Sequence, residues 1–200
     1  MQRNSLFAMF FLAASLPLFS QVVPAATGSG LPQWSFGAGF SDFNPDLGHG
    51  RLAGGTLWID YTVKGLPRSL RGISIAIEGR DLSFDRSSTE AVLRVDTAGG
   101  GAIYKWPHFT NFRPYANVIV GLGNIDYMVS KTEKYNQSRT VTSIGGGLEF
   151  RALRSVWVRA GYEYQYWPNF FITKVNSPYG APLDPQGFTV GATYNIGHVR

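Results

Sequence analysis

Histidine is the side chain best suited to acid–base chemistry at neutral pH, and this 200-residue chain has only three, His49, His108 and His198. A hydrolase or acyltransferase also needs a nucleophile and an orienting acid within hydrogen-bond reach of that base. No serine partner is evident for His49, and acids and histidines nowhere cluster at the spacing of metal ligands. The pattern therefore predicts no catalytic residue, no cofactor and no metal site.

The charged residues indicate ion pairing instead. Eight of them lie within segments whose polarity alternates residue by residue, and all eight share the polar side of that alternation: Asp60, Glu78, Arg80, Arg94, Asp96, Glu149, Arg159 and Glu163. Five acids and three arginines can neutralise one another in a confined interior. Because like charges directly opposite each other are unfavourable, we expect Glu78 to lie near Arg94. The alternative register brings Arg80 near Asp96.

Eight segments of about ten residues carry this alternation, which is the period of a β-strand. They cover Trp34–Phe43, Ala53–Val63, Gly72–Phe84, a stretch from about Ala91, Arg113–Val129, Thr140–Arg151, Val156–Trp167 and Gln186–Gly197. The fourth segment becomes irregular at the three glycines 99–101, where we expect a bulge. In the fifth, Ile119 and Ile125 fall on the face opposite the other apolar residues, so its orientation is the least clear.

The predicted connections alternate in length. Residues 64–71, 107–112 and 152–155 would join strands at one rim, and residues 44–52, 85–90, 130–139 and 168–185 would join them at the other. Short turns at one rim and longer loops at the other are typical of transmembrane barrels with an even number of strands. Across the short turn 152–155, Glu149 is expected to lie opposite Arg159.

Alternation alone does not decide whether the apolar face meets lipid or a protein core. All five lysines fall in predicted loops or at strand ends, whereas a water-soluble barrel would carry lysine along its exposed strand faces. An arginine at bilayer depth on the lipid face would cost about 2–4 kcal/mol, which explains why charges keep to the polar side. The interpretation is an apolar face toward lipid and a polar lumen, with a soluble barrel as the alternative.

The bulk properties agree with an exported all-β protein. Residues 1–26 combine Arg3, an apolar stretch and small residues before Ala26, which predicts a signal peptide; residues 27–200 would form one barrel domain. Cysteine is absent, which argues against a disulfide framework and a lipid anchor. The net charge of +5 is not gathered in any basic run, so nucleic acid is not an expected partner.

The last segment resembles an assembly signal. Its polar Thr189 and Gly191 are followed by apolar Tyr194 and Ile196, and this order is similar to the C-terminal strand of small outer-membrane β-barrels of the outer membrane protein A/X type. The resemblance implies an eight-stranded antiparallel up-and-down transmembrane β-barrel in the bacterial outer membrane. It also implies contacts with outer-membrane lipid, including lipopolysaccharide, handling by the barrel-assembly machinery, and a monomeric state.

Three functions follow as hypotheses. The first is a structural or surface-interaction barrel that acts through its long loops, with its lumen plugged by the ion pairs; the apolar loop residues Phe170, Phe171, Ile172, Val175 and Tyr179 are the candidate contacts. The second is a lipid-modifying enzyme on the rim, with His49 as the candidate base. The third is a narrow gated channel, although eight strands leave little room for an aqueous lumen.

Overall fold

The computed structural model describes residues 30–46, 50–85, 92–130, 133–168 and 182–197. Eight strands and one turn of 3-10 helix follow in the order β1 Trp34–Asn44, β2 Leu52–Thr62, η1 Arg68–Leu70, β3 Ile73–Asp85, β4 Val92–Lys105, β5 Phe112–Ser130, β6 Glu133–Arg151, β7 Val156–Tyr166 and β8 Gln186–Ile196. No helix in these ranges is long and apolar enough to cross a membrane.

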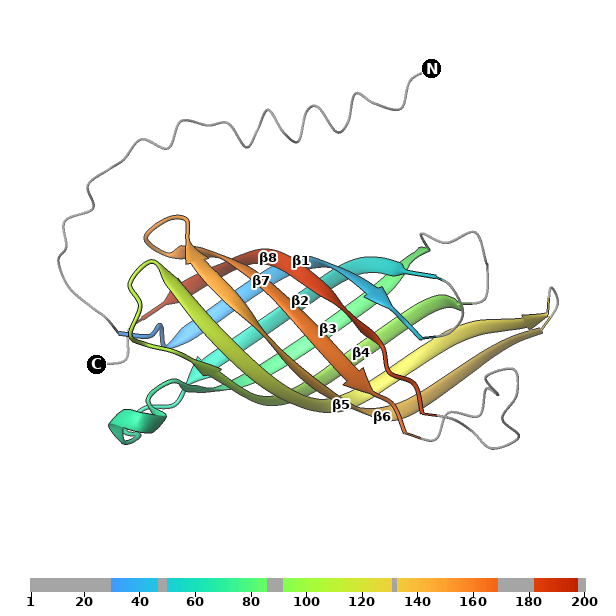
Figure 1. Ribbon diagram of the computed structural model, residues 1–200, viewed down its shortest axis with the longest axis horizontal. Coiled ribbons are helices and arrows are strands. Elements are labelled where there is room, and N and C mark those ends of the chain that lie inside the picture. The colour runs from blue at the N-terminus through green and yellow to red at the C-terminus, as the bar shows by residue number, and fades with distance from the viewer. Residues whose placement is uncertain (1–29, 47–49, 86–91, 131–132, 169–181, 198–200) are drawn as a thin grey trace, which may run out of the picture.

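The strands form a closed antiparallel barrel in which each strand pairs with the next and β8 returns to β1 (Figure 1). Trp34 of β1 pairs with Ile196 of β8. The predicted closure of the first segment onto the last is therefore confirmed. The start of β1, the end of β8 and the η1 turn lie at the same end of the barrel, which we call the terminal rim; the opposite end is the loop rim.

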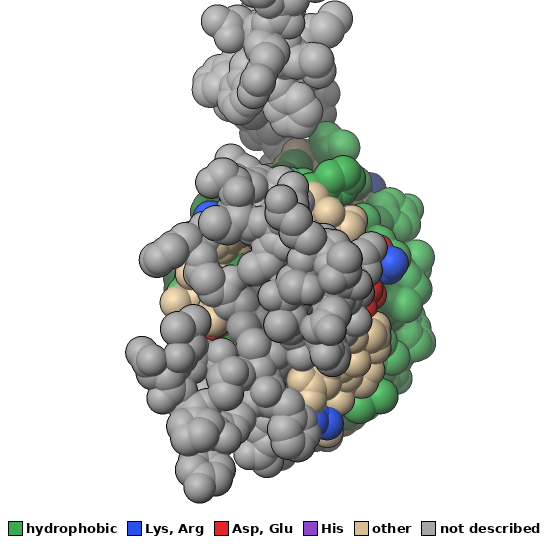
Figure 2. All heavy atoms as spheres, turned by 90° about the vertical axis from the view of Figure 1, so that its right-hand side faces the viewer, with side chains coloured by type: hydrophobic (Ala, Val, Ile, Leu, Met, Phe, Trp, Pro, Cys, Tyr) green, Lys and Arg blue, Asp and Glu red, His purple; other side chains and the backbone are tan. Residues whose placement is uncertain are grey.

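Side chains alternate between an apolar outside and a mostly polar inside. Leu57, Ile77 and Leu122 are exposed by 58–69 % on the outer face, whereas Ser35 and Thr193 are completely buried in the interior. Figure 2 looks onto the loop rim and shows hydrophobic side chains along the right-hand outer wall. A closed sheet leaves no unpaired strand edge, so this apolar surface can face hydrocarbon without exposing backbone polar groups.

Glycines on the inner face make room for the large interior side chains. A Cβ atom at Gly37 would stand 2.1 Å from the indole of Trp58, and one at Gly191 would stand 2.6 Å from the same ring. The alternation of small and large residues across the lumen thus follows from its narrow width.

Two predictions about the strands were wrong. Residues 130–139 were expected to form a loop, but β5 and β6 pair from Phe112↔Phe150 to Ser130↔Glu133, so this hairpin extends well beyond its neighbours (Figure 1). The bulge expected at residues 99–101 is also absent, because β4 keeps a continuous register there with both β3 and β5. The register shifts instead between Val92 and Arg94.

Candidate functional site

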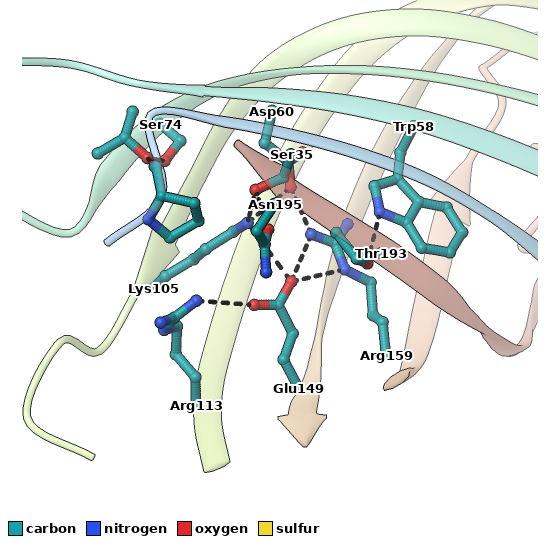
Figure 3. Close-up of polar contacts among 12 residues, drawn as sticks. Ser35, Trp58, Asp60, Ser74, Lys105, Arg113, Glu149, Arg159, Thr193 and Asn195 are labelled. Atoms are coloured by element: carbon teal, nitrogen blue, oxygen red, sulfur yellow. Dashed lines mark hydrogen bonds and ion pairs between the residues drawn. The ribbon is translucent and has the colours of Figure 1, made fainter. Parts of the chain in front are cut away.

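The interior next to the terminal rim holds a five-residue ion-pair network contributed by five different strands (Figure 3). Glu149 of β6 lies at its centre: its carboxylate is 2.6 Å from Nη2 of Arg159, 3.4 Å from Nζ of Lys105 and 3.4 Å from Nη1 of Arg113. Asp60 completes the network, with Oδ2 2.8 Å from Nζ of Lys105 and in contact with Arg159. We call this set the terminal network.

Each member of the terminal network is buried to at least 95 %. Charges removed from water to this extent are stable only when partners replace the lost hydration. Aromatic rings provide part of that replacement, since the guanidinium of Arg113 lies 4.2 Å from the ring centre of Trp157 and that of Arg159 lies 4.8 Å from Trp58. The Trp58 ring is held in turn by a 3.1 Å hydrogen bond from Nε1 to Oγ1 of Thr193.

A second ion cluster, the middle cluster, lies farther from the terminal rim. Arg80 of β3 donates to both carboxylate oxygens of Glu163 on β7, at 2.9 and 3.3 Å, and also contacts Glu78. Gln165 donates to Glu163 at 2.9 Å, and the Phe43 ring lies 4.2 Å from the Arg80 guanidinium. One arginine therefore links β3 to the opposite wall of the barrel.

Two small cavities adjoin the middle cluster, and Glu78, Arg80 and Glu163 line both. Each has a volume of about 20 Å³, which is enough for one or two waters. Oδ1 of Asn117, which lines one of them, has no hydrogen-bond partner within the protein. The space is far below what a small-molecule ligand needs.

The interior next to the loop rim is apolar. Eight buried side chains fill it and form one contact cluster, the apolar plug: Phe43, Leu52, Leu82, Val95, Ile125, Val141, Trp167 and Leu183. Trp167 and Leu183 pair through their backbones just beyond β7 and β8, and both are fully buried. The lumen is thus closed by charged side chains toward the terminal rim and by apolar side chains toward the loop rim.

Six of the eight charged residues predicted to meet in the lumen do so, in two separate groups: Asp60, Glu149 and Arg159, and Glu78, Arg80 and Glu163. Glu149 pairs with Arg159 across the β6–β7 turn, as predicted.

The placement of Arg94 and Asp96 in this network was wrong. Both lie on the outer surface, where Arg94 is paired with Asp96 and with Asp81. Consequently neither Glu78 nor Arg80 meets them; Glu78 pairs in register with Gly99, and Arg80 with Thr97. The reason is that polarity inverts at the loop rim: the inner face of β4 fills the apolar plug through Val95, and its outer face is polar there.

Two network members were missed in the sequence. Lys105 was treated as a strand-end lysine and Arg113 as the start of an unclear strand, yet both side chains are buried in the lumen. Counting in steps of two would have found them, because Lys105 shares its face with Ile103, and Arg113 shares its face with Tyr115 and opposes the exposed Val118.

In the predicted assembly signal, Tyr194 and Ile196 lie on the outer surface, and Thr189 and Gly191 share the inner face. Their role in assembly stays a prediction. The candidate loop contacts Phe170, Phe171, Ile172, Val175 and Tyr179 lie outside the described residues.

A closed barrel with an apolar outer band and a filled polar interior defines a transmembrane β-barrel of the small, eight-stranded class. The sequence matches the family described as outer membrane protein beta-barrel domain over residues 11–195, so the chain belongs to this family and resides in the bacterial outer membrane. No protein of curated function matches it significantly.

Solved structures show the same fold at low sequence identity. Neisserial surface protein A superposes with a TM-score of 0.58 at 15 % identity, covering 82 % of this chain and 96 % of its own. The attachment invasion locus protein Ail of Yersinia pestis gives 0.52 at 16 %, covering 83 % and 99 %. The N-terminal barrel domain of OprF from Pseudomonas aeruginosa gives 0.52 at 18 %, covering 82 % and 99 %.

Proposed function

We propose that this barrel has a structural or surface-interaction role exerted through its external loops, and that it neither transports solutes through its lumen nor catalyses a reaction. The observation that carries the proposal is the filled interior. The terminal network, the middle cluster and the apolar plug succeed one another along the barrel, and the two cavities described beside the middle cluster have room for only one or two waters each.

The names of two structural neighbours support a surface role, since one is a surface protein and the other an attachment and invasion protein. Ail has also been crystallised with the heparin analogue sucrose octasulfate. The apolar loop residues Phe170, Phe171, Ile172, Val175 and Tyr179 are the proposed contact segment in this chain, because aromatic and aliphatic side chains contribute strongly to partner binding.

Adhesion of whole cells tests the loop. Bacteria that carry the full chain in their outer membrane are compared on heparin-coated and uncoated surfaces with cells carrying a variant in which Phe170, Phe171 and Ile172 are serine. The matched control replaces Ser87, Ser88 and Thr89 of another loop by glycine. Adhesion lost in the first variant and kept in the control supports the proposal. Equal adhesion of both variants would show that the 169–185 loop is not the contact segment.

Conductance and lipid hydrolysis test the two alternatives. In planar bilayers the reconstituted protein is expected to give no large, steady ion current, and such a current would contradict a plugged lumen. Hydrolysis of phospholipid by the pure protein, abolished by His49→Ala, would establish an enzyme and overturn the proposal.

A further inference from the structure

The turns of the terminal rim carry five basic side chains that have no acidic partner. Lys64, Arg68 and Arg71 lie in the β2–β3 connection, and Arg151 and Arg154 lie at the β6–β7 turn. Four are exposed and Arg151 is half-buried, and none of the five takes part in an ion pair. Among the described residues, the acids nearest to this rim are Asp60 and Glu149, which are buried and paired inside the lumen.

The loop rim is arranged differently. There the exposed Arg51 is paired with Asp42 at 2.6 Å, and Arg94 is paired with Asp81 at 2.8 Å and with Asp96 at 2.9 Å. Arg51 and Arg94 at the loop rim are therefore paired with acids, whereas the five basic side chains of the terminal rim are not. Unpaired cations on one surface create a positive potential that attracts anions.

Exposed apolar side chains lie between these cations. Leu70 in the β2–β3 connection and Leu153 beside Arg154 are exposed by 44 % and 66 %. On the β4–β5 turn, Trp106 and Phe109 are exposed by about two fifths, and Phe109 stacks on Phe112 at 4.3 Å between ring centres. Aromatic and aliphatic side chains mixed with Lys and Arg are typical of segments that rest at a membrane surface.

We propose that the terminal rim binds the headgroups of anionic phospholipids in the leaflet that surrounds it. The apolar turn residues continue the band that faces hydrocarbon, so the cations are held at headgroup depth rather than away from the membrane. A soluble polyanion could bind the charges, but it would leave the apolar side chains exposed to water, namely Leu70, Leu153, Trp106 and Phe109. Near an anionic surface, one Lys or Arg strengthens binding about fivefold.

Lipid selectivity of the folded barrel tests this proposal. The full chain is reconstituted into phosphatidylcholine bilayers that contain a trace of spin-labelled phosphatidylglycerol or spin-labelled phosphatidylcholine, and the lipid fraction immobilised on the protein is measured by electron paramagnetic resonance. At low salt the anionic label is expected to associate about fivefold more strongly, and 0.5 M NaCl is expected to abolish the difference by screening.

Three variants assign the effect to the rim. The triple variant R68Q/R71Q/R154Q should lose the preference, R68K/R71K/R154K should keep it, and R51Q/R94Q at the loop rim should leave it unchanged. Heat-modifiable gel migration verifies folding of each, and the salt titration of the unmodified protein stands without any variant. Equal association of both lipids at low salt, or a preference that survives the glutamine variant, would overturn the proposal.

Discussion

Replacing Glu149 by glutamine removes the acid that three lumen cations share. Lys105 and Arg159 would then keep Asp60 as their acidic partner and Arg113 would lose Glu149, so the terminal network would change from a net charge of +1 to +2 within a fully buried space. Breaking a buried ion pair by removing one partner costs about 3–5 kcal/mol, because the remaining charge stays desolvated. We expect a loss of this size in the free energy of unfolding.

The assay is urea-induced unfolding of the barrel in lipid vesicles, followed by tryptophan fluorescence and by heat-modifiable gel migration. The matched control is Asp81→Asn, which breaks the exposed ion pair with Arg94 and is expected to change stability little. Adding Arg113→Gln to Glu149→Gln restores the net charge of +1 and should recover part of the loss as a coupling energy of about 0.5–3 kcal/mol. A loss below about 1 kcal/mol for Glu149→Gln would refute the view that these pairs hold the interior together.

Three further predictions concern packing and the lipid face. Gly147→Ala should cost about 1–3 kcal/mol of unfolding free energy, because its Cβ would stand 2.1 Å from the carbonyl oxygen of Ala160, whereas Gly55→Ala meets nothing within 4 Å and should be neutral. Trp167→Ala should cost about 3–5 kcal/mol by emptying the centre of the apolar plug, and single-barrel recordings should show increased ion leakage; unchanged leakage would mean that the ion clusters seal the lumen alone. Val118→Arg on the exposed apolar face of β5 should cost about 2–4 kcal/mol in vesicle unfolding, against about 0–1 kcal/mol for an arginine at Asn124 nearer the loop rim, and equal costs would contradict the placement of the lipid band.

The strand count, the closure of the barrel and its lipid-facing side were predictable because they depend on a period of two. That period survives in Trp34 to Phe40, in Leu57 to Tyr61 and throughout β8, where each residue's face follows from its neighbour's. The outer face of each strand contacts lipid and is apolar, whereas the inner face lines a narrow lumen and is polar. Both preferences are therefore visible in the sequence of each single strand.

The errors arose where the outer face is no longer apolar and the inner face is no longer polar. Near the loop rim the lumen is apolar and the outer surface is polar, so Val95 lies inside and Arg94 outside, against the rule that holds in the membrane. Polarity does not reveal at which residue a strand leaves the bilayer. For the same reason, a loop was predicted at residues 130–139, where the β5–β6 hairpin in fact continues to Ser130 and Glu133.

The sequence by itself determined that this protein is a transmembrane barrel, because alternation and the confinement of charge are local properties of each strand. Only the tertiary structure decided which charges meet, since Lys105 and Glu149 come from strands that do not pair, and their contact depends on closure and register together. The basic terminal rim has the same origin. No run of the sequence is strongly basic, but the up-and-down topology brings residues 64–71 and 151–154 to one end of the barrel and places Asp42, Asp81 and Asp96 near the other.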